Sequence, residues 1–215
     1  PAEKAQDTAR KDPARVHLGG PAQDMRQGLA LILAAAAAAA MPAVAAPRAE
    51  VVGRYDWAED LDGFGGVSGI DLAPDGLSFR IITDTGMTLD GTFARNAAGA
   101  VTGTVPGRWV LLQGEDPYPL ADMVRDAEAI SVLDDGSFFV AFEQNPRVEW
   151  YESPDTVAKL RSDGLDLSNQ PHNRSFEALA QGPDGAVYVL PEVPPAWGGP
   201  YPVQVLRDGR WTMPL

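Results

Sequence analysis

The chain has 215 residues, with 30 acidic and 17 basic side chains, a net charge of −13 and no cysteine. The acidic excess disfavours nucleic acid as a partner, because phosphate binding depends on Lys and Arg. The absence of cysteine excludes a disulfide scaffold and thiolate catalysis, but a chain of this length can still bury a hydrophobic core.

Residues 25–45 have the pattern of a secretory signal peptide. Met25 and Arg26 precede an apolar run, and Ala43-Val44-Ala45 supplies an A-x-A cleavage site. The run is short for a membrane span, so we expect no stable membrane insertion once the signal is cleaved. The pattern predicts a periplasmic or secreted protein. Residues 1–24 are expected to be a disordered or non-native upstream tail, which leaves 46–215 as the folded domain.

A unit centred on an Asp-Gly turn occurs three times in the rest of the chain. Runs rich in β-branched and aromatic residues flank each turn, and Asp-Gly between such runs indicates a β-hairpin. Further β-rich stretches between the copies bring each repeat to about four strands, which is typical of a propeller blade. The copies are Gly65–Gly86, Asp126–Gln144 and Ser175–Glu192, and the stretches between them are 101–103, 108–112, 148–151 and 157–160.

We therefore expect an all-β fold, a β-propeller with three to four blades in this chain. Helix is disfavoured because 19 Pro and 22 Gly interrupt the sequence, and Leu120–Ala129 would form at most a turn or two. A fourth blade would use strands near 51–55 and 203–211. A propeller must close on itself, so the sequence predicts that this one is incomplete.

Carboxylates occur at matching positions on both sides of the Asp-Gly turns. Glu128 and Glu143 flank the second turn, Glu177 and Glu192 flank the third, and Asp84 follows the first. The symmetry predicts that each glutamate pair lies directly opposite across two strands, where like charges destabilise a sheet. Blade symmetry would bring all five carboxylates to one mouth of the propeller. Carboxylates gathered there would suit a divalent cation, with Ca²⁺ as the first candidate. Alternatively, Glu128 and Glu177 accept hydrogen bonds from a neighbouring blade.

Other candidate site residues lie close to these carboxylates in the sequence. His172, the one histidine after the signal segment, is a candidate proton shuttle or ligand, or an ordinary surface residue. Arg125 and Arg174 each stand three residues before a repeat glutamate, which suits binding of an anionic substrate or pairing with the glutamate. The sequence around Ser68 lacks the last glycine of a nucleophile elbow and precedes a strand.

These blocks resemble the family described as esterase-like activity of phytase, the phytase-like domain proteins, which are exported bacterial β-propellers. The similarity runs from about Arg54 to the end of the chain, with Ser175 and Ala178 where small residues, often glycine, are expected. The resemblance implies a propeller with esterase or phosphoesterase activity. It is carried by Gly65–Ile70 with Asp84-Thr85-Gly86, Asp126–Ile130 with Phe142-Glu143, and Asn173–Leu179 with Leu190-Pro191-Glu192.

Three functional hypotheses follow. The leading one is an exported hydrolase of small-molecule esters or phosphate esters, in which Glu128 and Glu177 are metal ligands or general bases and His172 assists catalysis. The second is a non-catalytic propeller that binds a ligand or a protein partner through the same face, because fold does not fix function. The third is a Ca²⁺-dependent sugar-lactone hydrolase of related form.

Overall fold

The computed structural model describes residues 48–115, 125–161, 163–168 and 174–214. Almost all of them belong to one compact unit, Val51–Leu215. The expected upstream tail and signal peptide lie outside the described residues. The described residues contain no helix, and hence none long and apolar enough to cross a membrane.

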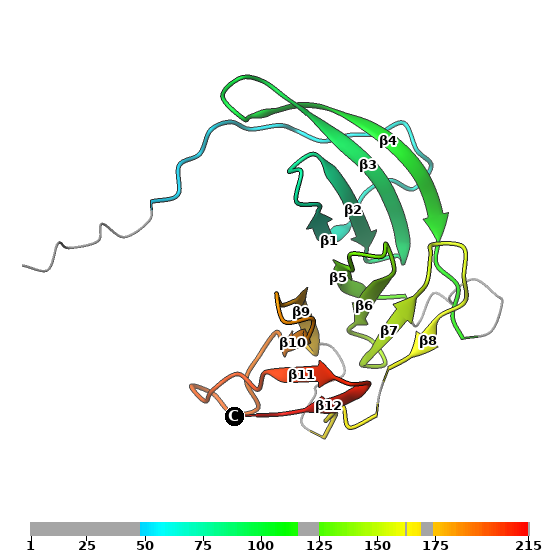
Figure 1. Ribbon diagram of the computed structural model, residues 1–215, viewed down its shortest axis with the longest axis vertical. Coiled ribbons are helices and arrows are strands. Elements are labelled where there is room, and N and C mark those ends of the chain that lie inside the picture. Colours follow the sequence, from blue (N-terminus) through cyan, green and yellow to red (C-terminus); the bar gives the residue numbers. More distant parts are fainter. Residues whose placement is uncertain (1–47, 116–124, 162, 169–173, 215) are drawn as a thin grey trace, which may run out of the picture. The chain divides into compact units, whose positions relative to one another are not determined.

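The described residues form three sheets of four antiparallel strands, each sheet a meander in chain order (Figure 1). The first contains β1 (Val67–Leu72), β2 (Ser78–Thr83), β3 (Met87–Arg95) and β4 (Val101–Leu111). The second contains β5 (Ala127–Val132), β6 (Phe138–Phe142), β7 (Arg147–Tyr151) and β8 (Lys159–Leu160). The third contains β9 (Phe176–Gln181), β10 (Val187–Pro191), β11 (Gln204–Arg207) and β12 (Arg210–Thr212). Because β5 contacts both β1 and β9, the first strands of the sheets lie side by side.

The predicted Asp-Gly hairpins are confirmed at the first turn of every sheet. Gly76, Gly136 and Gly185 have φ values of 68°, 85° and 78°, a left-handed conformation that glycine adopts without steric cost. Each of these glycines donates its amide hydrogen to the carbonyl three residues earlier. This arrangement is a tight turn followed by a left-handed residue, which matches the twist of the two strands.

The strand expectations in the first repeat need correction. The sequence pattern does not predict β3, because Gly91 and Asp90 interrupt its apolar residues; the Phe79 ring fills the space beside Gly91, and Arg80 forms an ion pair with Asp90. The stretches expected at 101–103 and 108–112 belong to one strand, β4. Proline at position 106 is tolerated there because β4 lies at the edge of its sheet.

Two further expectations differ from the structure. Residues 51–55 form no strand, and the strands near 203–211 are β11 and β12 of the third sheet, so neither supplies a fourth sheet. Residues 127–129, the end of the short helical segment allowed at Leu120–Ala129, belong to β5. The rest of that segment, up to residue 124, lies outside the described residues.

The second sheet takes part in two apolar cores. Ile130 and Phe138 pack in a cluster that includes Ile82 of the first sheet. Their neighbours in the chain, Ala129 and Phe139, pack in a cluster that includes residues of the third sheet. This alternation follows from the strand period of two residues, which sends successive side chains to opposite faces. Burial on both faces therefore fixes the register of β5 and β6, the strands that carry the acidic residues of the second sheet.

Candidate functional site

The same irregularity occurs near the start of the first strand in every sheet. In the second sheet the register passes from Ala127 opposite Phe142 to Ala129 opposite Ala141, so Glu128 has no directly opposite residue. Ser68 and Glu177 are skipped in the same way in the other two sheets. Each skipped residue forms a β-bulge, and bulges change the direction of a side chain. The bulges therefore change the direction of Glu128 and Glu177, and no residue of the second strand lies directly opposite either one.

The observed register overturns the predicted pairing of Glu128 with Glu143 and of Glu177 with Glu192. In each sheet, the acidic residue that follows the second strand donates its amide hydrogen to the carbonyl of the residue just before the first strand. These hydrogen bonds join Asp84 to Gly66, Glu143 to Asp126 and Glu192 to Ser175, at 2.9, 2.8 and 2.7 Å. The prediction of direct opposition is wrong for two reasons. It centred each hairpin between the Asp and the Gly of the turn, whereas the observed strand pairs centre the hairpins on Asp135 and Asp184. The bulge then adds one more residue to the first strand.

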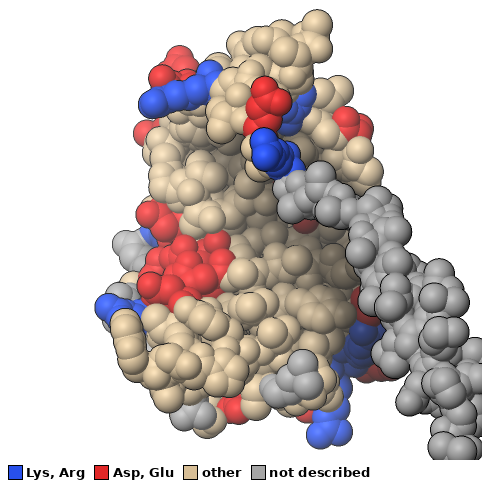
Figure 2. Space-filling view, turned by 90° about the vertical axis from the view of Figure 1, so that its left-hand side faces the viewer, with Lys and Arg blue, Asp and Glu red and all other residues tan. Residues whose placement is uncertain are grey.

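Five carboxylates of the second and third sheets come together at this end of the strands. Asp126, Glu128 and Glu143 each offer an oxygen within 4.8 Å of the others, and so do Glu143, Glu177 and Glu192. Glu143 belongs to both triads, so it links side chains of two sheets. Figure 2 shows a contiguous patch of acidic side chains beside a hollow lined by uncharged residues. These five residues form the acidic cluster.

The protein alone stabilises the charges of the acidic cluster poorly. Burial raises the pKa of Glu128 to about 8, and the charges of Glu177 and Asp126 add to the shift. Burial is also the main cause of a raised pKa at Glu143, which is only 8% exposed. Partial desolvation and the charge of Glu192 raise the pKa of Glu177. Raised carboxyl pKa values gathered at one place are typical of a site that binds a cation or transfers a proton.

Four of the five predicted metal ligands belong to the acidic cluster, and Asp84 does not. Asp84 is exposed, follows the second strand as Glu143 and Glu192 do, and places its carboxylate over Gly66, where a side chain would collide with it. Arg125 is partly buried and Arg174 is exposed, and each directly precedes the residue whose carbonyl receives the shared hydrogen bond. His172 lies outside the described residues.

Asp126 is the member of the acidic cluster that the sequence argument missed. A hairpin centred between Asp135 and Gly136 would pair Glu143 with Glu128, and so leaves Asp126 beyond the pairing. The bulge at Glu128 instead brings Asp126 to the position that pairs with Glu143. The signal available in the sequence was the pair of carboxylates at 126 and 128, because a bulge can bring two such side chains to the same end of a sheet.

The acidic cluster fits a hard divalent cation. Its donors are carboxylate oxygens, the ligands that Ca²⁺ and Mg²⁺ prefer. Ca²⁺ takes about six to eight oxygens in flexible geometry, with each carboxylate binding through one or both oxygens. A triad supplies several oxygens from three side chains, and water could complete the coordination shell of either cation.

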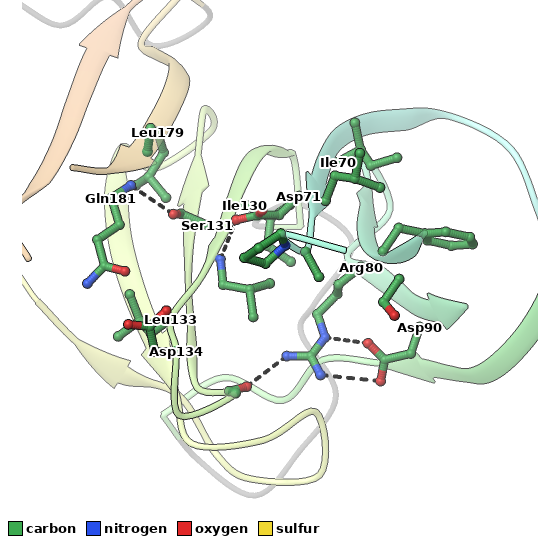
Figure 3. A pocket seen from close by; sticks show the side chains of 18 residues that line it. Ile70, Asp71, Arg80, Asp90, Ile130, Ser131, Leu133, Asp134, Leu179 and Gln181 are labelled. Carbon is green, nitrogen blue, oxygen red and sulfur yellow. Dashed lines mark hydrogen bonds and ion pairs between the residues drawn. The ribbon is translucent and has the colours of Figure 1, made fainter. Parts of the chain in front are cut away.

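A cavity lies toward the Asp-Gly end of the first strands (Figure 3). It has a volume of about 630 Å³ and is lined by residues of all three sheets, including Asp71, Ser131 and Arg80. These polar groups contact other parts of the protein. Asp71 accepts a hydrogen bond from the Val132 amide, and Ser131 accepts one from the Gln181 amide. Arg80 forms an ion pair with Asp90 within the first sheet and donates a hydrogen bond to the Gly136 carbonyl of the second sheet. Their role is to join the sheets, so the acidic cluster is the better candidate for chemistry.

Comparisons with solved structures find similar chains of low identity. Virginiamycin B lyase from Staphylococcus aureus is 15% identical, with a TM-score of 0.39 over 68% of this chain and 40% of that one. A protein described as a gluconolactonase is 15% identical, with a TM-score of 0.42 over 72% of this chain and 50% of that one. The chain thus spans half or less of the length of these structures. A search of curated proteins found no significant match.

The comparison with protein-family models gives a match that covers most of the chain. The model described as phytase-like, esterase-like activity of phytase, matches residues 62–210. The match runs from before β1 to the first residue of β12, and so includes every member of the acidic cluster. The family inferred from the sequence motifs is thereby confirmed, and the chain belongs to the phytase-like family described by esterase-like activity of phytase.

Proposed function

We propose that this protein is a hydrolase of ester or phosphate-ester bonds, with a divalent cation, Ca²⁺, held by the acidic cluster. We also propose that the three sheets are consecutive blades of a β-propeller. Each sheet is a four-stranded antiparallel meander, and the first strands lie side by side, as the blades of a propeller require. In such an arrangement, residues at one repeat position converge on one mouth, and the acidic cluster would lie at that mouth.

The observation that carries the proposal is the pair of carboxylate triads that share Glu143. Burial and mutual repulsion raise the carboxyl pKa values there, so ionised carboxylates are costly in the metal-free protein. A cation offsets this cost by attracting the charges that repel one another. Family membership supports the choice of ester and phosphate-ester substrates.

The residues of the cluster would divide the work. Glu143 would be the shared ligand, with Glu192 and Asp126 completing the two triads. Bound Ca²⁺ would polarise the phosphoryl or carbonyl oxygen and lower the pKa of a coordinated water. Glu128 and Glu177, re-aimed by their bulges, would ligate the cation or accept the proton of the attacking water. A carboxyl pKa near neutrality suits Glu128 to proton transfer.

Two arginines and a histidine that flank the acidic cluster would bind the substrate and assist the reaction. Arg174 is exposed and Arg125 partly exposed, at matching places just before the acidic end of two sheets. Guanidinium groups bind carboxylate and phosphate oxygens through paired hydrogen bonds, so both residues would attract an anionic substrate. His172, a few residues before Glu177, would assist proton transfer. Export through the signal at 25–45 would place the enzyme in the periplasm or outside the cell.

Neutralising single glutamates tests the proposal. We expect Glu128→Gln and Glu177→Gln to lower Ca²⁺ affinity and turnover by at least about tenfold, while stability changes little, because Gln keeps the shape and removes the charge. Isothermal titration with Ca²⁺ and assays with a chromogenic phosphate ester and a chromogenic carboxylic ester measure both effects. The matched control is Glu152→Gln, at an exposed glutamate between β7 and β8 that belongs to neither triad.

The outcomes separate the competing functions. Metal binding without turnover of either ester would favour a non-catalytic binding protein. Turnover of sugar lactones in preference to both esters would favour a Ca²⁺-dependent lactone hydrolase. Unchanged Ca²⁺ binding and turnover in both glutamine variants would contradict the proposal and leave the glutamates with a structural role.

A further inference from the structure

Two serine hydroxyl groups donate hydrogen bonds across a sheet boundary to main-chain carbonyls. One carbonyl belongs to a member of the acidic cluster and the other to a residue beside two members. Ser175, of the segment before β9, is fully buried, and its Oγ donates to the carbonyl of Glu143 at 2.9 Å. Ser68 of β1 donates its hydroxyl to the carbonyl of Ala127 at 2.5 Å. Ala127 stands between Asp126 and Glu128, so each hydroxyl fixes backbone that carries cluster residues.

Ser175 connects the carboxylates of two sheets. Its hydroxyl holds the backbone of Glu143 in the second sheet, while its own carbonyl accepts the amide hydrogen of Glu192 in the third sheet at 2.7 Å. Glu143 and Glu192 belong to the same triad. One buried residue therefore sets the spacing between two side chains that come from different sheets.

The repeat shows how these serines are related to the acidic residues. Ser68 occupies the bulge position that holds Glu128 and Glu177 in the other two sheets. Ser175 occupies the position before the first strand that holds Asp126 in the second sheet. The same two repeat positions thus supply carboxylates in some sheets and a hydroxyl directed at the neighbouring sheet in others.

We propose that Ser175, assisted by Ser68, is a positioning residue that sets the geometry of the acidic cluster across the sheet boundaries. The inference rests on the proposed metal site and goes beyond it by assigning residues that touch neither the cation nor the substrate. Neighbours that orient metal ligands matter to affinity, and their loss typically weakens metal binding by about 10- to 100-fold. Without its hydroxyl, Ser175 would leave the buried Glu143 carbonyl without this donor and free the two sheets to shift.

The chain offers a matched control at the other end of the same sheet boundary. Ser131 is also a buried serine, and its Oγ accepts the amide hydrogen of Gln181, so it too joins the second sheet to the third. Ser131 lies toward the Asp-Gly turn, four positions along β5 from the start of the strand, and belongs to neither triad. Loss of its hydroxyl tests the effect of weakening the boundary without disturbing the acidic end.

The test is isothermal titration of the full chain with Ca²⁺, together with urea unfolding in chelator. We expect Ser175→Ala to raise the Kd for Ca²⁺ about tenfold, Ser68→Ala to raise it severalfold, and Ser131→Ala to leave it within twofold. Ser175→Thr keeps the hydroxyl and should restore most of the affinity. If Ser175→Ala does not fold, Ser68→Ala against Ser131→Ala makes the same comparison.

The possible failures can be told apart. If the unmodified chain binds no Ca²⁺, the proposed metal site itself is wrong. If the unmodified chain binds Ca²⁺ and both Ser175→Ala and Ser68→Ala stay within twofold of it, the positioning role is wrong while the metal site stands. Equal losses of affinity in Ser131→Ala and Ser175→Ala at equal stability would also overturn the inference, because a general weakening of the sheet boundary would then explain both.

Discussion

The two ends of the first hairpin in each sheet use carboxylates in opposite ways. At the turn end, hydrogen bonds from Ser137 lower the pKa of Asp135, and a hydrogen bond from Arg207 lowers that of Asp184. At the other end, burial raises the pKa values of Glu128 and Glu143. The turn aspartates find their partners within their own sheet and stabilise the fold. When ionised, the glutamates repel one another and destabilise the metal-free protein. Such uncompensated charge is typical of a binding site, whereas paired charge is typical of a structural role.

Removing one carboxylate charge at each end of the hairpin should give the largest difference in Ca²⁺ affinity. We expect Glu143→Gln to weaken Ca²⁺ binding by roughly a hundredfold or more, since Glu143 belongs to both triads. The same change should slightly raise the stability of the metal-free protein, because it removes a buried like charge. Asp135→Asn should instead leave Ca²⁺ affinity unchanged and slightly lower stability, because it weakens the hydrogen bonds from Ser137. Isothermal titration and thermal unfolding in chelator measure both, and a rise in stability for Asp135→Asn would break the comparison.

The two ends should also respond to pH in opposite directions. Glu128 has a pKa raised from 4.5 to about 8. In the metal-free protein, the contribution of its protonated form to the free energy of unfolding is therefore complete below pH 4.5 and is lost as the pH rises to 8. The turn aspartates have pKa values lowered from 3.8, so their contribution is present above pH 3.8 and is lost as the pH falls further. We expect the free energy of unfolding to fall by about 1 to 2 kcal/mol between pH 4.5 and 8, allowing for solvent screening.

Urea unfolding across this pH range, with chelator and then with Ca²⁺, measures the effect. Ca²⁺ should remove the fall on the alkaline side, because the cation stabilises the ionised carboxylates and its binding releases protons. Glu128→Gln in chelator serves as the control and should flatten the same part of the curve. A metal-free curve that is already flat between pH 4.5 and 8 would show that the charges at the acidic end are not costly.

The sequence predicts the turn end better than the acidic end, for a physical reason. An Asp-Gly turn is a local feature, since glycine reaches positive φ easily and the aspartate bonds to residues within three positions. The hairpin tips and the all-β architecture of four-stranded units follow from such local signals. The pairing at the acidic end depends on the exact centre of the turn and on a bulge, and the Asp-Gly motif alone specifies neither. That is why Asp126 was missed and direct opposition was wrongly expected.

Other errors originate in tertiary contacts. The sequence does not predict β3 because Gly91 and Asp90 look unlike strand residues until the Phe79 ring and the Arg80 guanidinium are beside them. The positioning serines carry no motif, since Ser175 and Ser68 acquire their role only through carbonyls of a neighbouring sheet. Repeat symmetry predicts four of the five members of the acidic cluster, because it transfers a position from one sheet to the next.

A glycine at each end sharpens the comparison with the smallest expected effects. A Cβ at Gly69 would lie 3.0 Å from the Ile130 nitrogen and 3.1 Å from the Ala129 Cα, both main-chain atoms of β5. Gly69→Ala must therefore separate the first and second sheets, at a cost of about 1 to 3 kcal/mol. Gly136 has φ 85° and open space around it, so Gly136→Ala costs roughly 1 kcal/mol through backbone conformation alone.

The two variants should differ more in metal binding than in stability. Gly69→Ala moves β1 away from β5 next to the Ser68 hydrogen bond, so we expect it to weaken Ca²⁺ binding severalfold as well as to lower the urea midpoint. Gly136→Ala changes only a hairpin tip, and its Kd for Ca²⁺ should stay within twofold of the unmodified chain. Titration of both variants at a temperature where each is fully folded separates the two effects. Equal losses of affinity would mean that the acidic end responds to any loosening of the fold rather than to the approach of the neighbouring sheet.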